Sequence, residues 1–450
     1  MLHLFDTAQG RVVPFEPRVP GEVSIYVCGP TVYAPPHLGH GRFAVVFDVL
    51  RRYLEWSGLR VRYVSNITDI DDKIIARAAE EGRSTEEVVE ENERAWWEAM
   101  EAIGVARPTA DPHATAYVER MVELVSELVA AGAAYETSDG VYFSSSVVPD
   151  YGLLARQSIE SLRAGARVEV GEQKRSPIDF ALWKKAKPGE PAWPSPWGPG
   201  RPGWHTECVV MSLDLLGEGF DLHGGGQDLA FPHHENERAQ AVAAGRAFAR
   251  YWMHNGFVEV GGEKMSKSLG NFTDLADLVR STDPRAFRLL VLRAHYRSPV
   301  EVTRTTVDDA ARALERLDAF ARRAGSWPAA PADPAALDAF RAAMDDDLDT
   351  PRAVALLFSL VQRGHQAADA GDLVAAATAA ATVTEICRAL GLELRAGTGT
   401  VPDDVLAKGR ERDAARAARD WARADALRDE LIAAGYVVED TPSGTAIRPA

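Results

Sequence analysis

Apolar runs alternate with amphipathic stretches over the first 130 residues, and this pattern predicts strands and helices in turn. The apolar run at 23–27 predicts a buried strand, and the amphipathic stretch after it predicts a helix that runs to about Ser57 and stops at Gly58. A second strand is expected at 60–64. Two further helices are expected, at about 85–103, with Thr85 as the N-cap, and at 115–131. Strands that alternate with helices in this way indicate a doubly wound parallel sheet.

The α/β rhythm is interrupted at residue 135. Short apolar runs on either side of Asp139 and Gly140 predict a hairpin. The tract from Pro188 to Gly203 is rich in Pro, Trp and Gly, which predicts a loop. We therefore expect an insertion over 135–203. The α/β pattern then resumes with a helix near 206–215, a strand at about 219–222 and a hairpin with Gly261 and Gly262.

The second half of the chain is patterned as helix almost throughout. Helices typical of a bundle are expected at roughly 284–297, 304–323, 333–345, 350–369 and 373–391. A linker from Gly397 to Pro402, one long helix at about 408–434 and a closing hairpin with a turn at Pro442–Gly444 are expected after them. The patterns divide the chain into an α/β half over 1–134, the insertion over 135–203, a second α/β half over 204–283, a helical bundle over 284–396 and a small α+β domain over 403–450.

Composition narrows the class of protein. The chain has 450 residues, of which 46% are hydrophobic and 26% charged, which is typical of a soluble globular protein. No apolar run reaches the ~18 residues of a membrane span, and the N-terminus lacks the basic and apolar regions of a signal peptide. Its three cysteines favour a reducing compartment over a disulfide framework, so a cytoplasmic enzyme is expected. A net charge of −16 has the wrong sign for a general nucleic-acid binder, so nucleic acid would have to meet local basic patches.

The turn after the first strand has the features of a phosphate site. His37-Leu-Gly-His40 opens the first predicted helix, where free N–H groups and the helix dipole favour an anion. Gly39 lets a ligand approach the backbone closely, and the two histidines can donate hydrogen bonds to phosphate oxygens. The alternative is that these histidines are ordinary polar loop residues, because short motifs often match by chance.

Two further groups of residues could carry chemistry. His233 and Glu237 are i and i+4 on one helix face and, with Cys28 and Cys208, could supply the sulfur, nitrogen and oxygen ligands of a zinc ion. Spacing alone favours inert buried cysteines at both positions. The Lys264-Met-Ser-Lys267-Ser segment puts two ammonium groups on a loop that could close on a triphosphate, or that could simply be solvated.

The His-Leu-Gly-His and Lys-Met-Ser-Lys-Ser motifs together resemble those of class I aminoacyl-tRNA synthetases. Further segments narrow the resemblance to the cysteinyl-tRNA synthetase family: residues 26–33, 66–73, 204–208, 223–229, 231–237, and in the C-terminal domain 420–425 and 439–445. Leu38 stands where isoleucine is usual in that family. The resemblance implies a Rossmann-like doubly wound parallel-sheet catalytic domain with a connective-peptide-like insertion, followed by a helical bundle and an α+β anticodon-recognition-like domain.

The resemblance also implies the roles of particular residues. Cys28, Cys208, His233 and Glu237 would hold one zinc ion that binds the cysteine thiolate, which a serine hydroxyl cannot match near neutral pH. The catalytic residues would be His37, His40, Lys264 and Lys267, and ATP would also contact Gly39 and Ser268. The residues implied for the amino-acid pocket are Tyr26, Gly29, Thr31, Thr68, Trp204, His223 and Asp228, with Asp228 facing the substrate ammonium.

The implied substrates are L-cysteine, ATP with Mg²⁺, and tRNA(Cys), used by a monomer that meets no membrane. In two steps the enzyme would form cysteinyl-adenylate and transfer the cysteinyl group to tRNA. Two alternatives stay open: the paralogous ligase that passes cysteine to an amino sugar in mycothiol synthesis, and a non-catalytic zinc-dependent tRNA or nucleotide binder. The long region 305–450 argues against the first alternative, because an amino sugar needs no anticodon reader, and the intact signature motifs argue against the second.

Overall fold

The structure is a computed structural model that describes residues 1–157, 173–259, 274–395, 402–441 and 444–449. The hairpin glycines Gly261 and Gly262 and the loop residues Lys264, Lys267 and Ser268 lie outside the described residues, as does most of the predicted linker. Contacts divide the chain into two compact units. The first comprises Met1–Leu314, Pro334–Leu357 and Glu385–Glu393, and the second comprises Glu315–Asp333, Phe358–Thr384 and Leu394–Ala450.

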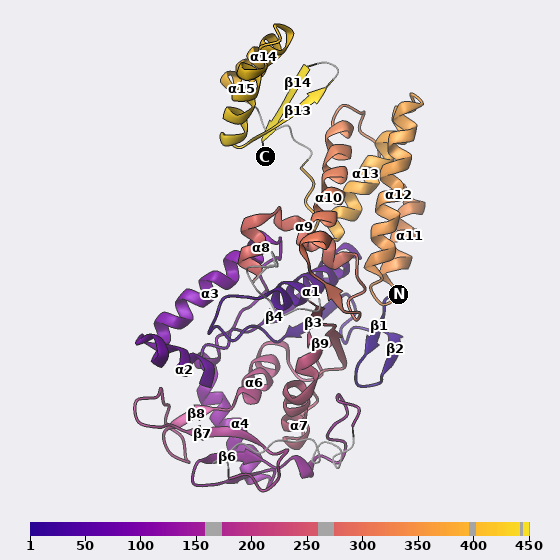
Figure 1. The fold of residues 1–450 in the computed structure, drawn as a ribbon. Helices are drawn as coiled ribbons and strands as arrows, with labels where there is room; N and C mark the ends of the chain where they lie inside the picture. Colours follow the sequence, from indigo (N-terminus) through magenta and orange to yellow (C-terminus); the bar gives the residue numbers. More distant parts are fainter. Residues whose placement is uncertain (158–172, 260–273, 396–401, 442–443, 450) are drawn as a thin grey trace. The chain divides into compact units, whose positions relative to one another are not determined.

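The first unit is built on a four-stranded parallel sheet in the order β10-β9-β3-β4 (Figure 1). The strands are β3 (Glu22–Val27), β4 (Arg60–Ser65), β9 (Leu222–Gly226) and β10 (Tyr251–Asn255). The chain leaves β3 for β4 and later returns to β9 on the other side of β3. In such a sheet, ligands bind at the carboxyl ends of the strands where the order reverses, here between β3 and β9. This topology confirms the predicted doubly wound sheet.

Strand β9 begins where the predicted strand at 219–222 ends, so that prediction was wrong. The three glycines at 224–226, which suggest a loop in the sequence, belong to the strand. A Cβ atom on Gly224 would lie 2.3 Å from the Phe47 ring. The strand is therefore glycine-rich because the first helix packs directly on its backbone.

Helix α1 (Leu38–Trp56) ends beside Gly58, which has a φ of +90°, as the pattern predicted. Its first turn is a capping box made by the two signature histidines. Nδ1 of His37 accepts a hydrogen bond from the backbone N–H of His40, and the backbone N–H of His37 donates to Nδ1 of His40. The helix is buried along most of its length and contacts α9 (Pro284–Leu292) and α3 (Thr85–Ala102) as well as the sheet. The motif is thus held at a fixed point above the strand ends.

Helix α3 covers the predicted span, but its cap differs from the prediction. Ser84, not Thr85, is the N-cap, and it forms a capping box with Glu87. The hydroxyl of Thr85 bonds instead to Glu86. The helices that flank α3 are α2 (Asp72–Glu81), a short 3₁₀ turn at Ala114–Tyr117 and α4 (Val118–Ala130).

The insertion contains a four-stranded antiparallel sheet in the order β5-β6-β7-β8. Strands β5 (Ala134–Glu136) and β6 (Gly140–Phe143) form the predicted hairpin, and β7 (Phe180–Lys185) and β8 (Gly200–Pro202) extend it. The prediction of a loop over 188–203 is therefore wrong for its last residues, because Gly200–Pro202 form a strand. Gly200 pairs with Lys185, and its missing Cβ leaves room for the Lys184 carbonyl oxygen, which would otherwise be 2.2 Å away.

The α/β rhythm resumes with α6 (Trp204–Leu216) and α7 (Glu235–Ala243), which pack against each other. In Figure 1, α1 and α6 lie on opposite sides of the parallel sheet. Other short elements of this unit are β1 (His3–Asp6), β2 (Arg11–Pro14), β11 (Val258–Glu259), α8 (Leu275–Ser281) and β12 (Val300–Glu301). Short helical turns lie at Ser145–Val147, Gln227–Leu229 and Ala230–His234.

The predicted helices of the second half are present as α9, α10 (Arg304–Ala324), α11 (Pro334–Met344), α12 (Thr350–Asp369) and α13 (Leu373–Ala389). The long helix expected at 408–434 is wrong, because two helices, α14 (Asp403–Ala417) and α15 (Trp421–Ala433), replace it. Arg419 takes a left-handed φ of 63° and Asp420 caps α15, which together turn the chain. The predicted hairpin is β13 (Tyr436–Thr441) with β14 (Gly444–Pro449). In the described part of the chain no helix combines the length and the apolar character that a membrane span needs.

Candidate functional site

A cavity of about 480 Å³ opens at the carboxyl ends of the parallel strands. Four of the seven residues predicted for the amino-acid pocket line it: Gly29, Thr31, Trp204 and Asp228. The other three, Tyr26, Thr68 and His223, are buried behind it, each at most 1% exposed. The predicted phosphate-site residues His37, Gly39 and His40 line the same cavity, and so does Cys28. The topology therefore joins segments that lie up to 200 residues apart.

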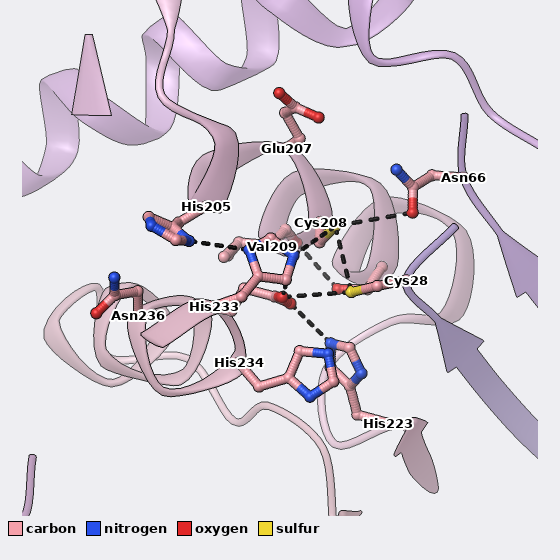
Figure 2. Close-up of polar contacts among 12 residues, drawn as sticks. Cys28, Asn66, His205, Glu207, Cys208, Val209, His223, His233, His234 and Asn236 are labelled. Atoms are coloured by element: carbon pink, nitrogen blue, oxygen red, sulfur yellow. Dashed lines mark hydrogen bonds and ion pairs between the residues drawn. The ribbon is translucent and has the colours of Figure 1, made fainter. Parts of the chain in front are cut away.

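The four predicted zinc ligands meet in one buried cluster. Each offers one atom, and the four atoms lie within 4.8 Å of one another. The Sγ atoms of Cys28 and Cys208 are 3.6 Å apart, and Cys28 Sγ is 3.4 Å from an oxygen of Glu237. Nε2 of His233 lies 3.6 Å from Cys208 Sγ and 3.0 Å from the same Glu237 oxygen. Figure 2 shows Cys28 reaching this point from the end of β3, and Cys208 and His233 from the helical segments beside it.

The spacing of these atoms fits a zinc ion. Zinc bonds of about 2.3 Å to sulfur and 2.0–2.2 Å to nitrogen or oxygen, at tetrahedral angles, place two sulfurs about 3.8 Å apart and a nitrogen and an oxygen about 3.4 Å apart. The observed edges of 3.0 to 3.6 Å are slightly shorter than these values. Two sulfurs, one imidazole nitrogen and one carboxylate oxygen are also a donor set that zinc accepts. The residues present therefore fit the metal that the resemblance implies.

Neighbouring rings hold His233 with Nε2 toward the cluster. Its Nδ1 is 2.9 Å from Nδ1 of His205, and its ring stacks on Trp204 with centroids 3.9 Å apart. A hydrogen bond from Nδ1–H to His205 leaves Nε2 free as a ligand, which is the usual arrangement around a metal-bound histidine. His205 and Trp204 are adjacent on α6, so one helix turn orients the imidazole.

The charges of the cluster suit a bound cation. Burial would raise the pKa of Cys208, but the hydrogen bond from the Cys28 thiol and the contact with His233 lower it to about 6. Burial raises the pKa of Cys28. For Glu237, burial acts to raise the pKa, yet His223 and His233 hold it well below its usual value. A thiolate and a carboxylate are therefore favoured at neutral pH, and metal ligands of these types must be deprotonated.

Three further histidines, His223, His234 and His254, lie beside Glu237 and form hydrogen bonds there. His223 Nε2 is 2.7 Å from the other oxygen of Glu237, and His234 Nδ1 is 2.8 Å from His254 Nε2. All three histidines are buried (Figure 2 shows His223 and His234). Cys28, His223, His234 and Glu237 form a second set of atoms close enough to hold a metal ion. This set shares Cys28 and Glu237 with the first, so the two sets describe one site that either Cys208 and His233 or His223 and His234 complete.

The start of α1 forms the part of the cavity for which the sequence predicts a phosphate site. The rings of His37 and His40 stack with centroids 3.7 Å apart, and His40 meets the edge of Trp96. Burial lowers the pKa of His37, and it lowers the pKa of His40 to about 3. Both side chains are therefore neutral at pH 7 and can donate a hydrogen bond without carrying charge.

Sequence reasoning gave no role to several residues that shape the site. Asn66 accepts a hydrogen bond from the Gly29 N–H at 2.9 Å, and the hydroxyl of Thr68 donates to the buried Glu207 at 2.8 Å. Burial raises the pKa of Glu207 well above its usual value. His205 and His254 support the metal cluster, and Lys73 lines the cavity. All except His254 lie within the motifs that carry the family resemblance, so position in a motif was the available signal.

Comparisons with known proteins agree with this geometry. The family model described as "tRNA synthetases class I (C) catalytic domain" matches residues 14–312. A DALR domain model matches 339–395, and a cysteinyl-tRNA ligase anticodon binding domain model matches 409–448. The chain is 50% identical over 455 residues to the cysteine–tRNA ligase of Halorhodospira halophila, covering 99% of both chains. It is 47% identical over 472 residues to that of Thermus thermophilus, covering 98% of both.

Solved structures share the fold at low identity. Mycobacterium tuberculosis methionyl-tRNA synthetase in complex with methionyl-adenylate matches with a TM-score of 0.61 at 16% identity, covering 82% of this chain and 89% of that one. An Agrobacterium radiobacter LeuRS in a ternary complex with tRNA and LeuAMS matches with a TM-score of 0.62 at 12% identity, covering 84% and 85%. The parallel sheet, its crevice and the catalytic-domain match define a class I aminoacyl-tRNA synthetase. Within that class, the chain belongs to the cysteine–tRNA ligase family, a family of enzymes.

Proposed function

We propose that this protein activates L-cysteine with ATP and transfers the cysteinyl group to tRNA(Cys), with a zinc ion that selects the cysteine thiolate. The observation that supports this most directly is the buried cluster of Cys28, Cys208, His233 and Glu237, because its member Cys28 also lines the cavity that the His37–His40 turn lines. One cavity thus offers a thiol-selective end and a phosphate end. The choice of tRNA as the acceptor rests on the names of the full-length relatives, which are cysteine–tRNA ligases.

Selection of cysteine at the Cys28, Cys208, His233 and Glu237 cluster depends on the ligand atoms that these residues offer to a zinc ion. A zinc ion bound there would supply strong affinity for a thiolate, which a serine hydroxyl cannot provide near neutral pH. The chain's own residues hold the donors in place: His205 orients His233, and His223 bonds to Glu237. Because the cluster is buried, water is a poor competitor for the site. Asp228, exposed at the cavity edge, would accept hydrogen bonds from the substrate ammonium and fix the carboxylate toward ATP.

The phosphate end would hold ATP with its Mg²⁺. Neutral His37 and His40 would donate hydrogen bonds to phosphate oxygens, and Gly39 would let the phosphate chain approach the helix N-terminus. We keep Lys264, Lys267 and Ser268 as further ATP contacts on the resemblance alone. A cysteine carboxylate oxygen then attacks the α-phosphorus, the bond to pyrophosphate breaks, and cysteinyl-adenylate forms. Positioning and charge stabilisation drive such a step, and no protein nucleophile is needed.

Transfer to tRNA completes the reaction. A ribose hydroxyl at the tRNA 3′ end attacks the carbonyl carbon, the proton leaves the hydroxyl, and AMP departs with its bonding electrons.

We propose that the helices of 284–396 and the domain of 403–450 bind the tRNA. Trp421, 59% exposed at the start of α15, offers a surface for base stacking. Arg416 and Arg423 are paired with Asp440 and Glu411, which leaves Arg419 and Arg428 as the better-placed cations of that domain.

The experiment that tests the proposal measures two reactions with zinc-replete full-length protein. Cysteine-dependent exchange between ATP and pyrophosphate reports the first step, and transfer of labelled cysteine to total tRNA reports the second. We expect both, and no exchange with serine. Exchange without labelled tRNA would indicate an amino-sugar acceptor, and zinc and ATP binding without exchange would indicate a binding protein; either result overturns the proposal.

A further inference from the structure

Lys73 lines the cavity that holds His37 and His40. It is the second residue of α2, and its backbone N–H donates to the N-cap Asp71 at 2.9 Å. Its ammonium nitrogen lies 5.1 Å from the ring centroid of Tyr33, which also lines the cavity. The side chain is exposed, so the charged end faces the open space of the cavity.

The position is unfavourable for a lysine in the absence of an anion. The N-terminus of a helix carries a partial positive charge, so a cation in the first turn is repelled. The adjacent carboxylate of Asp72 is already paired with Lys184 at 2.6 Å and with Arg201. Within the described residues, no carboxylate lies within ion-pair distance of the Lys73 ammonium group. The ammonium group has the Tyr33 ring and the nearby charge of Asp71 as partial compensation, and among the described residues it makes no ion pair that a phosphate would have to displace.

The cavity also lacks any other source of positive charge among its described lining residues. His37 and His40 are neutral at pH 7 because burial lowers their pKa values, and the charge of Lys73 contributes to the lowering at His40. Asp228 adds a negative charge. A nucleotide phosphate chain carries several negative charges, so a lysine in the cavity would add to the positive charge that Mg²⁺ brings. The charge of Lys73 comes after burial and the charge of His37 among the causes of the lowered His40 pKa, and the shared lining of one cavity is the geometric observation that places Lys73 beside the turn.

We propose that Lys73 binds the phosphate chain of the nucleotide and is a further substrate-binding residue of this cavity. The assignment rests on the proposed function in taking that nucleotide to be ATP. Lys73 supplies a point charge from one side, and the helix N-terminus with its two neutral histidines supplies hydrogen-bond donors from the other. The alternative, a solvated surface lysine, predicts no effect on nucleotide binding.

The test compares three variants of the full-length, zinc-replete chain. Lys73→Met keeps most of the stem and removes the charge, Lys73→Arg keeps the charge, and Lys187→Met removes a charge from an exposed lysine outside the cavity. Calorimetric titration measures binding of ATP and of inorganic pyrophosphate, and the exchange reaction gives kcat and KM for ATP and cysteine. We expect Lys73→Met to weaken ATP binding by about 10- to 100-fold, with the KM for cysteine unchanged.

The remaining outcomes separate this inference from the proposed function. Lys73→Arg should recover most of the affinity, and Lys187→Met should match the unsubstituted chain. ATP and pyrophosphate binding to Lys73→Met within twofold of the unsubstituted chain overturns the inference even if exchange is normal. A chain that binds ATP through Lys73 but shows no cysteine-dependent exchange supports the inference and contradicts the proposed function. Absence of ATP and pyrophosphate binding in the unsubstituted chain overturns both.

Discussion

At the scale of single residues, the site depends on atoms whose separations are set by several elements at once. The sulfurs of Cys28 and Cys208 come within 3.6 Å because the first turns of α6 lie beside the end of β3. Glu237 contacts both the cluster and His223 with its two oxygens. Burial makes each of these contacts strong and makes each unpaired group costly. The first two predictions therefore concern individual side chains of this cluster.

Cys208→Ser removes one sulfur from the zinc donor set. We expect cysteine binding to be lost while ATP binding changes less than twofold, because the ATP end of the cavity is built from α1 and not from the cluster. Removal of zinc with a chelator should have the same effect. Calorimetric titration with each substrate measures both. Cys387→Ser is the matched control, since Cys387 is an equally buried cysteine on α13 outside the cluster. Unchanged cysteine affinity in Cys208→Ser would contradict the selector role.

His205→Phe keeps an aromatic ring beside His233 but removes the acceptor for its Nδ1–H. We expect zinc affinity to fall about 10- to 100-fold, as is usual when the partner of a metal-bound histidine is lost. Competition with a chromophoric chelator measures this affinity directly. His113→Phe serves as the control, because His113 is partly exposed and bonded to Glu93 away from the cluster. Equal zinc affinity in the two variants would show that His205 does not orient His233.

At the scale of secondary structure, helix ends were harder to predict than helix existence. The amphipathic pattern of 85–102 predicts a helix, but Ser84 and Thr85 are both good N-cap residues. The capping box needs a Glu or Gln three residues after the cap, and Glu87 satisfies this for Ser84. The same spacing from Thr85 reaches Val88, which cannot complete the box. The sequence therefore favours Ser84 over Thr85 as the cap once the partner residue is considered.

Ser84→Ala should destabilise the first turn of α3 by about 0.5–2 kcal/mol, since the free N–H groups at the helix start lose their acceptor. Hydrogen exchange at the Glu87 amide, which donates to the Ser84 hydroxyl, should become faster by a corresponding factor. Thr85→Ala is the matched control and should leave that amide nearly unchanged, because the Thr85 hydroxyl bonds only to Glu86 in the described contacts. Equal acceleration in both variants would contradict the observed cap.

At the scale of the whole molecule, a buried ion pair joins distant segments of the first unit. Arg288 on α9 is 1% exposed and pairs with Asp48 on α1, and it also donates to the carbonyl oxygens of Leu390, Ile103 and Gly104. Burial acts to raise the pKa of Asp48, but Arg288 and Arg52 hold it below its usual value. Burial also lowers the pKa of Arg288, which stays protonated at any pH at which the fold survives.

Asp48→Asn leaves the Arg288 charge buried without a partner, so we expect a loss of about 3–5 kcal/mol at pH 7. Because the folded pKa of Asp48 is lowered, its contribution is complete above the unfolded pKa of about 3.9 and is lost as pH falls through the folded value. The difference between variant and unsubstituted chain should therefore shrink below about pH 4. Urea unfolding of the first unit at a series of pH values measures this.

A surface pair provides the comparison for that experiment. Arg60 and Glu22 form an ion pair with side chains 77% and 48% exposed. Glu22→Gln should change stability by at most about 1 kcal/mol, because water and salt screen exposed charges. A loss in Asp48→Asn no larger than in Glu22→Gln would show that the buried pair does not hold α1 to α9.

The sequence by itself determined the elements and the kinds of chemistry available. Apolar runs predicted β3 and β4 of the parallel sheet, and helical periodicity predicted most helices, because burial of one face leaves a repeat in the chain. His37, Gly39 and His40 marked a phosphate turn because helix N-termini attract anions. The family resemblance named Cys28, Cys208, His233 and Glu237, which spacing alone could not join across 180 residues.

Only the tertiary structure decided which residues meet. The cluster exists because strand order reverses between β3 and β9, and that pairing depends on the whole core rather than on any local segment. Three features were missed for the same reason, which is that they leave no periodic signal in the sequence. The glycines of β9 are set by close packing against Phe47, and the strand Gly200–Pro202 is set by pairing with β7. The break between the last two helices is set by the left-handed turn at Arg419. The position of Lys73 in the same cavity as His40 is likewise a product of packing, because α1 and α2 are separate segments that both contribute lining residues to it.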